Sequence, residues 1–199
     1  MSIMLGDRAA GLYLGDVLLT GYGYAAAPAL ISEKGYVGYF SVGSPSTYLT
    51  DGFTIEACCM LTDTSVAARQ YQRLGEIELS SSGLATLALS NDQLEFELFG
   101  TWKHASTTDL TLSRDVMHTV AMVVDPEVNA AIYVDGVLLR YYTAVSAMKT
   151  NRVADIYSNC GEISNRSFLG TSYANRFYLR PLTEAEVVAN HQLDVSRFG

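Results

Sequence analysis

The stretch from Leu74 to Phe99, LGEIELSSSGLATLALSNDQLEFELF, decides the fold. It holds three segments that alternate apolar and polar residues, separated by short connectors rich in Ser, Asn, Asp and Gly. Such alternation predicts strands with one buried face, and connectors of this length predict hairpins. We therefore expect an antiparallel meander with strands over 74–79, 84–89 and 93–99. Its core face would hold Ile77, Leu79, Leu87, Leu89, Leu94, Phe96 and Leu98, and its solvated outer face Glu76, Glu78, Thr86, Glu95 and Glu97.

Short strands and turns extend over the rest of the chain. The pair Asp135-Gly136 is typical of a tight turn and predicts a hairpin of strands 131–134 and 137–142. Thr183 with Glu186 three residues later forms a capping box, which predicts a helix over 183–192. The pattern predicts one all-β domain, a two-sheet antiparallel sandwich with a core that includes Phe53, Ile55, Val120, Met122, Ile132 and Val134. The other expected strands are 11–19, 35–42, 53–61, 116–125, 152–157, 167–170 and 174–180.

Composition excludes several classes of partner. The chain has 199 residues, with 13 Lys and Arg against 21 Asp and Glu, and a formal net charge of −8. Nucleic acids and anionic membranes attract clustered positive charge, so neither is expected to bind. We find neither a secretory signal pattern at the start nor a run long enough for a transmembrane helix. Cys58, Cys59 and Cys160 are odd in number and two are adjacent, so we expect buried free thiols rather than disulfides or a zinc site.

Four segments follow one another within residues 46–193: FTIEA from Phe53, HTVAMV from His118, IYVDG from Ile132 and FYLRPLTEAE from Phe177. In order and spacing they resemble the laminin-G-like branch of the concanavalin A-like lectin and glucanase family. The resemblance implies a jelly-roll sandwich with a short C-terminal helix. Where that family often has Trp, this chain has Cys58 and Met117, and Ala174-Asn175 replaces an acidic pair. The resemblance therefore does not imply the family's metal site.

The first 24 residues precede these segments and contain two Leu-Gly-Asp units and an apolar strand. They resemble the start of small tail and structural proteins of bacteriophages, which implies a virion protein made in the host cytoplasm. We expect an arm, residues 1–24, on a jelly-roll domain, residues 25–199. An unpaired apolar strand invites pairing with a sheet, so Tyr13, Leu14 and Val17 are expected to dock the arm. The arm can add to a sheet of its own domain or of a neighbouring subunit. We favour the neighbouring subunit, which predicts a homo-oligomer, with a trimer as the favoured state.

Catalytic patterns are incomplete in this chain. Glu76 and Glu78, like Glu95 and Glu97, have the i, i+2 spacing that places two carboxylates in one glucanase cleft. Neither pair is completed by the third acidic residue of a Glu-x-Asp-x-x-Glu pattern, and no Gly-x-Ser-x-Gly motif occurs. His118 lies in an apolar strand, where a hydrogen-bonded structural role is expected. We therefore predict no enzyme activity and no catalytic residue.

Aromatic residues in polar connections are the candidates for sugar binding, because sugars stack on rings and their hydroxyls need polar neighbours. The expected loop 100–106 contains Trp102, Lys103 and His104. The other candidates are Tyr142, next to Tyr141 after a hairpin, and Tyr157 and Tyr173, which flank the long connection 158–172.

Calcium would need several converging oxygen ligands. Asp125, Asp135 and Glu162 are available, but no ligand spacing marks them, so no metal or cofactor is predicted.

These features predict a non-enzymatic structural, decoration or tail-associated protein of a phage virion, with a lectin-like jelly roll that binds host-surface glycans. Its expected partners are other virion subunits and a cell-surface polysaccharide. A free-standing carbohydrate-binding module is the alternative, and a glycoside hydrolase is a more remote one.

Overall fold

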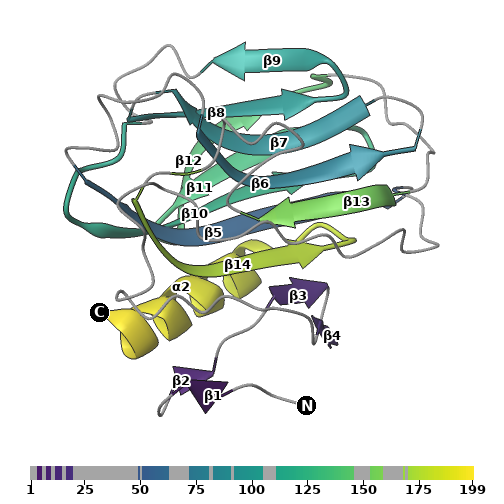
Figure 1. Cartoon of the computed structure of the whole chain (residues 1–199). Coiled ribbons are helices and arrows are strands. Elements are labelled where there is room, and N and C mark those ends of the chain that lie inside the picture. The colour runs from purple at the N-terminus through teal and green to yellow at the C-terminus, as the bar shows by residue number, and fades with distance from the viewer. Residues whose placement is uncertain are drawn as a thin grey trace.

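The structure is a computed structural model of the 199-residue chain, and its described residues include two stacked β-sheets with helix α2 (Glu184–Phe198) on the outside (Figure 1). It describes residues 4–5, 8–9, 12–14, 17–19, 49, 51–62, 72–80, 83–90, 92–104, 111–145, 153–158, 168 and 170–199. The strand expected over 35–42 lies outside the described residues, as do Cys160 and Glu162. The described strands confirm the all-β sandwich.

The larger sheet has seven strands in the order β12-β11-β10-β5-β14-β3-β4. Its centre is β5, which pairs antiparallel with β10 on one side and with β14 on the other. The hairpin β11–β12 turns at Asp135 and Gly136, which both have positive φ, as a two-residue turn of the predicted type requires. The strands are β3 (Leu12–Leu14), β4 (Val17–Leu19), β5 (Phe53–Leu61), β10 (Met117–Val124), β11 (Ala130–Val134), β12 (Val137–Tyr142) and β14 (Gly170–Tyr178).

The smaller sheet has five strands in the order β13-β6-β7-β8-β9 and is antiparallel throughout. It confirms the predicted meander. The expected loop 100–106 is wrong in its first half, because the chain turns at Phe99 and Gly100, which both have positive φ, and returns as a fourth meander strand. The strands are β6 (Gln72–Leu79), β7 (Gly83–Ser90), β8 (Gln93–Leu98), β9 (Thr101–His104) and β13 (Val153–Ser158).

The hydrophobic core lies between the two sheets. All seven apolar residues predicted to face it from the meander are buried there, as are Phe53, Ile55, Val120, Met122 and Ile132, while Val134 packs against its margin. Gly75 lets the sheets approach closely: a Cβ at this position would lie 2.6 Å from Ile55 Cγ2 and 3.0 Å from Phe177 Cζ. The free thiols of Cys58 and Cys59 are buried, as predicted.

The outer face of the five-stranded sheet corrects one prediction. The alternation correctly places the polar residues on the face away from the core, but most of them are buried rather than solvated. Glu76 and Thr86 are fully buried, Glu95 is 5% exposed and Glu97 is 8% exposed, whereas Glu78 is half-buried. Alternating polarity separates the two faces of a strand, but it does not distinguish a wet face from a buried polar face.

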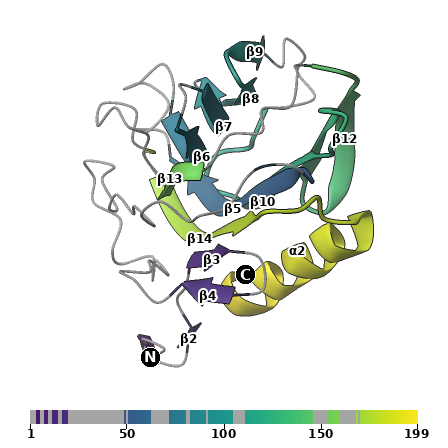
Figure 2. The ribbon, with the colours of Figure 1, turned by 90° about the vertical axis from the view of Figure 1, so that its right-hand side faces the viewer.

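Helix α2 (Glu184–Phe198) lies along the outer face of the seven-stranded sheet (Figure 2). Its N-terminus has the predicted capping box, in which Thr183 Oγ1 accepts from the Glu186 N–H and Glu186 accepts from the Thr183 N–H. It continues to Phe198, six residues beyond the predicted end at 192, and Asp194 in this extension is buried against the sheet. In the described part of the chain, no helix combines the length and apolarity needed to span a membrane.

The N-terminal arm adds to the sheet of its own chain. β3 pairs parallel to β14, with Tyr13 opposite Arg176 and Leu14 opposite Phe177. β4 then pairs antiparallel with β3, so the strand expected over 11–19 is a small hairpin. A separate ribbon of β1 (Met4–Leu5) and β2 (Arg8–Ala9) precedes it. The arm thus pairs with its own domain, whereas the sequence analysis favoured pairing with a neighbouring subunit.

Candidate functional site

One row of residues crosses all five strands of the smaller sheet on the face away from the core. The backbone register places Tyr157 of β13 opposite Glu76 of β6, Glu76 opposite Thr86 of β7, and Thr86 opposite Glu97 of β8. Glu97 in turn lies opposite Trp102 of β9. Directly opposite positions share a face of a sheet. The row therefore has an aromatic residue at each edge and polar residues between them, and we call it the aromatic-edged row.

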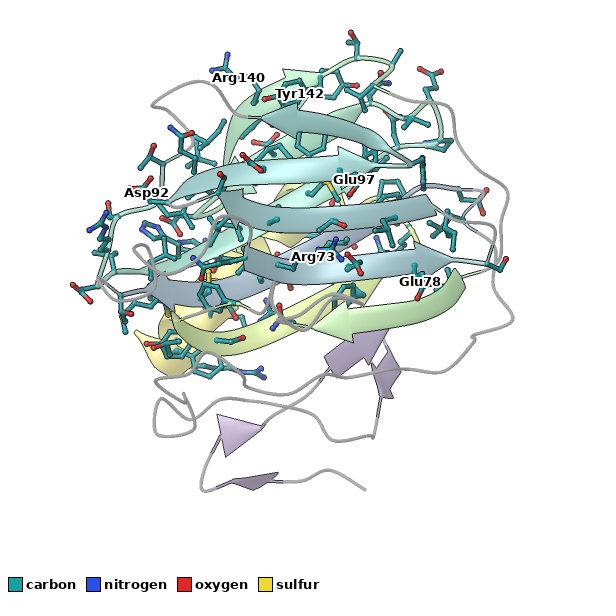
Figure 3. All side chains as sticks on the ribbon, turned by 45° about the horizontal axis from the view of Figure 1, so that its top comes forward. Arg73, Glu78, Asp92, Glu97, Arg140 and Tyr142 are labelled. Atoms are coloured by element: carbon teal, nitrogen blue, oxygen red, sulfur yellow. The ribbon has the colours of Figure 1, made fainter. Side chains whose placement is uncertain are left out.

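A second row runs beside the first on the same face. Arg73 of β6 lies opposite Ala88 of β7, Ala88 opposite Glu95 of β8, and Glu95 opposite His104 of β9. This row brings a cation, a carboxylate and an imidazole residue to one strip of the sheet. Figure 3 labels Arg73, Glu78 and Glu97 on this sheet.

Charge pairing explains how the polar centre of this face is buried. Arg73 forms an ion pair with Glu76, and both side chains are almost fully buried. Thr86 Oγ1 donates a second hydrogen bond to Glu76 Oε2 at 3.1 Å. A buried carboxylate that is paired and hydrogen-bonded is held in one orientation. These three residues thus form a fixed polar floor between the two edges of the sheet.

The backbone register unites three of the predicted sugar-binding residues and separates the others. Trp102, His104 and Tyr157 occupy positions on the outer face of the five-stranded sheet. Lys103 lies opposite Phe96, a core residue, and so has a position on the other face. The sequence pattern grouped Trp102, Lys103 and His104 as loop neighbours, whereas in strand β9 their positions alternate between faces.

Tyr142 and Tyr173 lie elsewhere in the fold. Tyr142 is half-buried, and its ring meets the Phe96 ring edge-on with centroids 5.1 Å apart, while its neighbour Tyr141 is 53% exposed. Tyr173 is buried, with its ring centroid 5.4 Å from that of Phe198 in α2. Neither of these two residues belongs to the aromatic-edged row, and both pack as structural aromatics.

A buried ionic cluster under α2 was not expected from the sequence. Arg176 Nη1 of β14 donates to Glu56 Oε2 of β5 and to Asp194 Oδ2 of α2, both at 3.0 Å, and Arg176 Nη2 donates to Asp194 Oδ1. Asn190 Nδ2 donates to Glu56 Oε2 at 2.9 Å, and Thr119 Oγ1 donates to Asp194 Oδ2 at 3.0 Å. The cluster joins three sheet strands to the helix. Asp194 lies beyond the predicted end of the helix, which is why the pattern missed it.

The electrostatics of the cluster favour a neutral Glu56. Burial raises the pKa of the Glu56 carboxyl to about 7, although the Arg176 guanidinium acts in the opposite direction. Glu56 Oε2 receives both donors, and Oε1 has no hydrogen-bond partner. The neutral form is thus favoured by burial, while Oε1 is a buried polar atom without a partner.

Two histidines, His118 of β10 and His191 of α2, lie beside the Asp135 carboxylate. His118 Nδ1 lies 2.7 Å from Asp135 Oδ2, which confirms the expected hydrogen-bonded role, and His191 Nδ1 lies 3.9 Å from Asp135 Oδ1. Burial acts to raise the pKa of Asp135, but hydrogen bonds from His118 and the Thr119 N–H hold it below its ordinary value. Asp125, the other described residue considered for calcium, accepts hydrogen bonds from the backbone N–H and the side-chain amide of Asn129. Among the described residues no group of His, Cys, Asp and Glu side chains could hold a metal ion.

A family model described as the concanavalin A-like lectin/glucanases superfamily matches residues 34–188, which is most of the chain. The chain belongs to this superfamily. The match includes every strand of the five-stranded sheet, and the two-sheet architecture agrees with it. The aromatic-edged row is therefore a feature of a lectin-like jelly roll. Residues 1–33 lie outside the match, and no curated protein matches the chain.

Solved structures share the superfamily fold at low sequence identity. The binding domain of botulinum neurotoxin serotype G is 12% identical with a TM-score of 0.55, and the match covers 75% of this chain and 38% of that one. A SAP-like pentraxin from Limulus polyphemus is 12% identical with a TM-score of 0.56, covering 70% and 69%. A Trypanosoma rangeli sialidase is 18% identical with a TM-score of 0.55, covering 75% and 24%. This chain spans about two fifths of the neurotoxin domain and a quarter of the sialidase.

Proposed function

We propose that this jelly roll is a non-enzymatic glycan-binding module whose ligand contacts the two edge strands of the five-stranded sheet, β9 and β13. The observation that supports the proposal is the aromatic-edged row, in which Tyr157 and Trp102 occupy the two edges of one polar strip. Aromatic residues at the sheet edges suit sugar binding, because pyranose rings stack on aromatic rings. Family membership favours the same class of ligand.

The burial of the carboxylates favours binding over hydrolysis. A glycosidase needs two carboxyl groups that reach the scissile bond. Glu76 is fully buried against Arg73 and Thr86, so its carboxylate is engaged within the polar floor. In this proposal Trp102, His104 and Tyr157 contact the ligand, and the Arg73–Glu76 pair within β6 neutralises buried charge at the centre of the same face.

A glycan array that spans neutral, amino and acidic sugars tests the proposal. The full chain should retain a defined subset of glycans and release no reducing ends from them during prolonged incubation. Retention of no glycan would contradict the binding proposal. Release of reducing ends that disappears in Glu76→Gln or Glu78→Gln would instead favour a hydrolase.

We propose further that the module belongs to a phage virion, as a decoration, structural or tail-associated protein that contacts host-surface polysaccharide. The support is the resemblance of residues 1–24, whose β3 strand adds to the sheet edge beside β14. Comparison of the full chain with a chain that begins at Ala25 separates this role from that of a free-standing module. The truncated chain should keep glycan binding and lose incorporation into particles. Incorporation without residues 1–24 would contradict the role of the arm.

A further inference from the structure

The two halves of helix α2 are held on the seven-stranded sheet by different kinds of contact (Figure 2). In the first half, Val187 is buried in an apolar cluster with residues of three sheet strands. In the second half, the side chains of Asn190, His191 and Asp194 each form a hydrogen bond with a sheet residue. Polar contacts depend on the protonation state of their groups, whereas apolar contacts do not, so pH acts mainly on the second half of the helix.

One guanidinium group contacts two carboxyl groups at this interface. Arg176 Nη1 donates to Glu56 Oε2 of the sheet and to Asp194 Oδ2 of the helix, and all three side chains are buried. While Glu56 is neutral, the charges of Arg176 and Asp194 balance. Ionisation of Glu56 leaves one buried negative charge in excess, which repels Asp194. Separation of the helix from the sheet relieves this repulsion, because Asp194 leaves while Glu56 and Arg176 stay opposite each other on β5 and β14.

We propose that the second half of α2, residues 190–198, is a pH-sensitive latch, which is closed on the sheet while Glu56 is neutral and opens beyond the Val187 anchor when Glu56 ionises. Burial raises the pKa of Glu56 to about 7 in the closed state, against an ordinary 4.5. A raised pKa stabilises the closed state below pH 4.5, and this contribution is lost as pH rises through 7. The open fraction should therefore rise up to about pH 7 and level off above it, while the two sheets stay folded.

The histidine contacts of the helix act in the same direction as Glu56. His191 Nδ1 lies 3.9 Å from Asp135 Oδ1, and an imidazole attracts a carboxylate only when it is protonated, so this contact also favours the closed state at acidic pH. Burial acts to raise the pKa of Asp135, but hydrogen bonds from His118 and the Thr119 N–H keep it below its ordinary value. Both of these donors belong to the sheet and stay with Asp135 when the latch opens.

The other titratable and charged groups at this interface leave the direction unchanged. Among the described residues they are Tyr133 of β11, Cys58 of β5, Tyr178 of β14, Arg180 after it, and Glu184, Glu186 and Arg197 of α2. Burial raises the pKa of Tyr133 and of the Cys58 thiol, so both stay neutral between pH 4.5 and 7. The hydrogen bond from Arg180 lowers the pKa of Glu186 to about 2, so this pair stays charged.

Two adjacent cysteines distinguish opening of the latch from unfolding of the chain. Cys58 is fully buried in a cluster with Tyr173, against which Phe198 of the latch packs. Burial and the nearby Asp194 carboxylate both raise the pKa of its thiol, which places it beneath the latch. Cys59 lies instead in the core between the sheets. Opening of the latch should uncover Cys58 and leave Cys59 buried, whereas global unfolding exposes both thiols.

Thiol labelling of two single-cysteine forms of the full chain tests the proposal. In a Cys160→Ser background, Cys59→Ala leaves Cys58 as the probe and Cys58→Ala leaves Cys59. Each labelling rate with an aromatic disulfide is divided by the rate of the same chain in denaturant at the same pH, which removes the pH dependence of the thiol itself. The normalised Cys58 rate should rise about 30-fold between pH 5.5 and 8.5. At pH 8.5 it should exceed the normalised Cys59 rate at least tenfold.

Two comparisons decide the outcome. Equal normalised rates for Cys58 and Cys59 would mean that Cys58 is uncovered only by global unfolding, which overturns the latch; this comparison needs no change at Glu56. In the Cys58 form, Glu56→Gln should label at a nearly constant normalised rate over the same pH range, and the exposed Glu127→Gln should label like the parent. A Cys58 rate that is independent of pH, or that rises equally in Glu56→Gln, would overturn the control of the latch by Glu56.

Discussion

At the residue scale, the structure stabilises buried charge by grouping it rather than by excluding it. Arg73 is paired with Glu76 in the five-stranded sheet, and Arg176 lies between Glu56 and Asp194 under the helix. Charges that are buried without partners are strongly unfavourable, whereas a paired and hydrogen-bonded group is tolerated. The two arginines therefore allow a chain with few charged residues to carry carboxylates on both outer sheet faces.

Glu56→Gln should remove one pH dependence of stability. The folded pKa of Glu56 is about 7 against an ordinary 4.5, so the carboxyl contributes stability below pH 4.5 that is lost as pH rises through 7. At about 1.4 kcal/mol per pKa unit, the parent should lose about 3 kcal/mol of unfolding free energy across this window relative to the variant. Gln can keep its carbonyl oxygen toward Arg176 and Asn190 and place its NH₂ at the Oε1 position.

Urea titrations at several pH values measure this difference in unfolding free energy. Glu127 is exposed, so Glu127→Gln is the control whose pH profile of stability should match that of the parent. The lowered pKa of Asp135 acts at more acidic pH and with the opposite sign, since its stability is lost as pH falls. Parallel pH profiles for the parent and Glu56→Gln would show that Glu56 is already ionised in the folded protein.

Ile132→Ala tests the core at the level of one side chain. Ile132 lies in β11 and is 2% exposed, so truncation should lower the unfolding free energy by about 2–5 kcal/mol through lost burial and a residual cavity. Val195→Ala, on the exposed side of α2, should change it by less than about 0.5 kcal/mol. If Ile132→Ala lowers the unfolding free energy by less than about 1 kcal/mol, the Ile132 side chain does not lie in the core.

At the scale of elements, α2 is held by its cap and by its buried face. The capping box fixes where the helix begins, and the Arg180–Glu186 ion pair joins its first turn to the chain after β14. The Asp194 contacts fix where it lies on the sheet. The two ends of the helix thus depend on different interactions.

Thr183→Ala and Asp194→Ala should separate these two contributions. Loss of the cap should cost about 1 kcal/mol of unfolding free energy. Loss of Asp194 removes a carboxylate partner of the buried Arg176 and leaves it beside Glu56, whose raised pKa favours the neutral form, so it should cost about 3–5 kcal/mol. Chemical denaturation of both variants gives the order, and an equal or larger loss in Thr183→Ala would mean that the buried cluster does not hold the helix.

Element positions were largely predictable because alternation and turn residues are local signals. The meander, the Asp135-Gly136 hairpin and the capping box follow from neighbouring residues alone. Strand β9 was missed because its turn uses Phe99 at positive φ, a conformation that the residue type does not suggest. The ionic cluster was missed because Glu56, Arg176 and Asp194 meet only through long-range pairing.

At the scale of the whole molecule, the two outer faces differ in character. The seven-stranded sheet is covered by α2 and extended by the arm, whereas the five-stranded sheet carries the aromatic-edged row (Figures 1 and 2). The sequence indicates Trp102, His104 and Tyr157 as aromatic residues and a polar neighbour in or beside connections. The strand register groups them for a different reason, namely that β9 and β13 are the two edges of one sheet.

The central claim is that glycans bind at the two edges of the aromatic-edged row, and the most direct measurement is a calorimetric titration of the best array glycan into three matched variants. Trp102→Ala and Tyr157→Ala should each weaken binding at least tenfold, because each removes one stacking residue from an edge of the row. Tyr141→Ala, which removes an exposed aromatic residue from β12 of the other sheet, should bind like the parent. Unchanged affinity in Trp102→Ala and Tyr157→Ala, in proteins that unfold like the parent, would contradict the account.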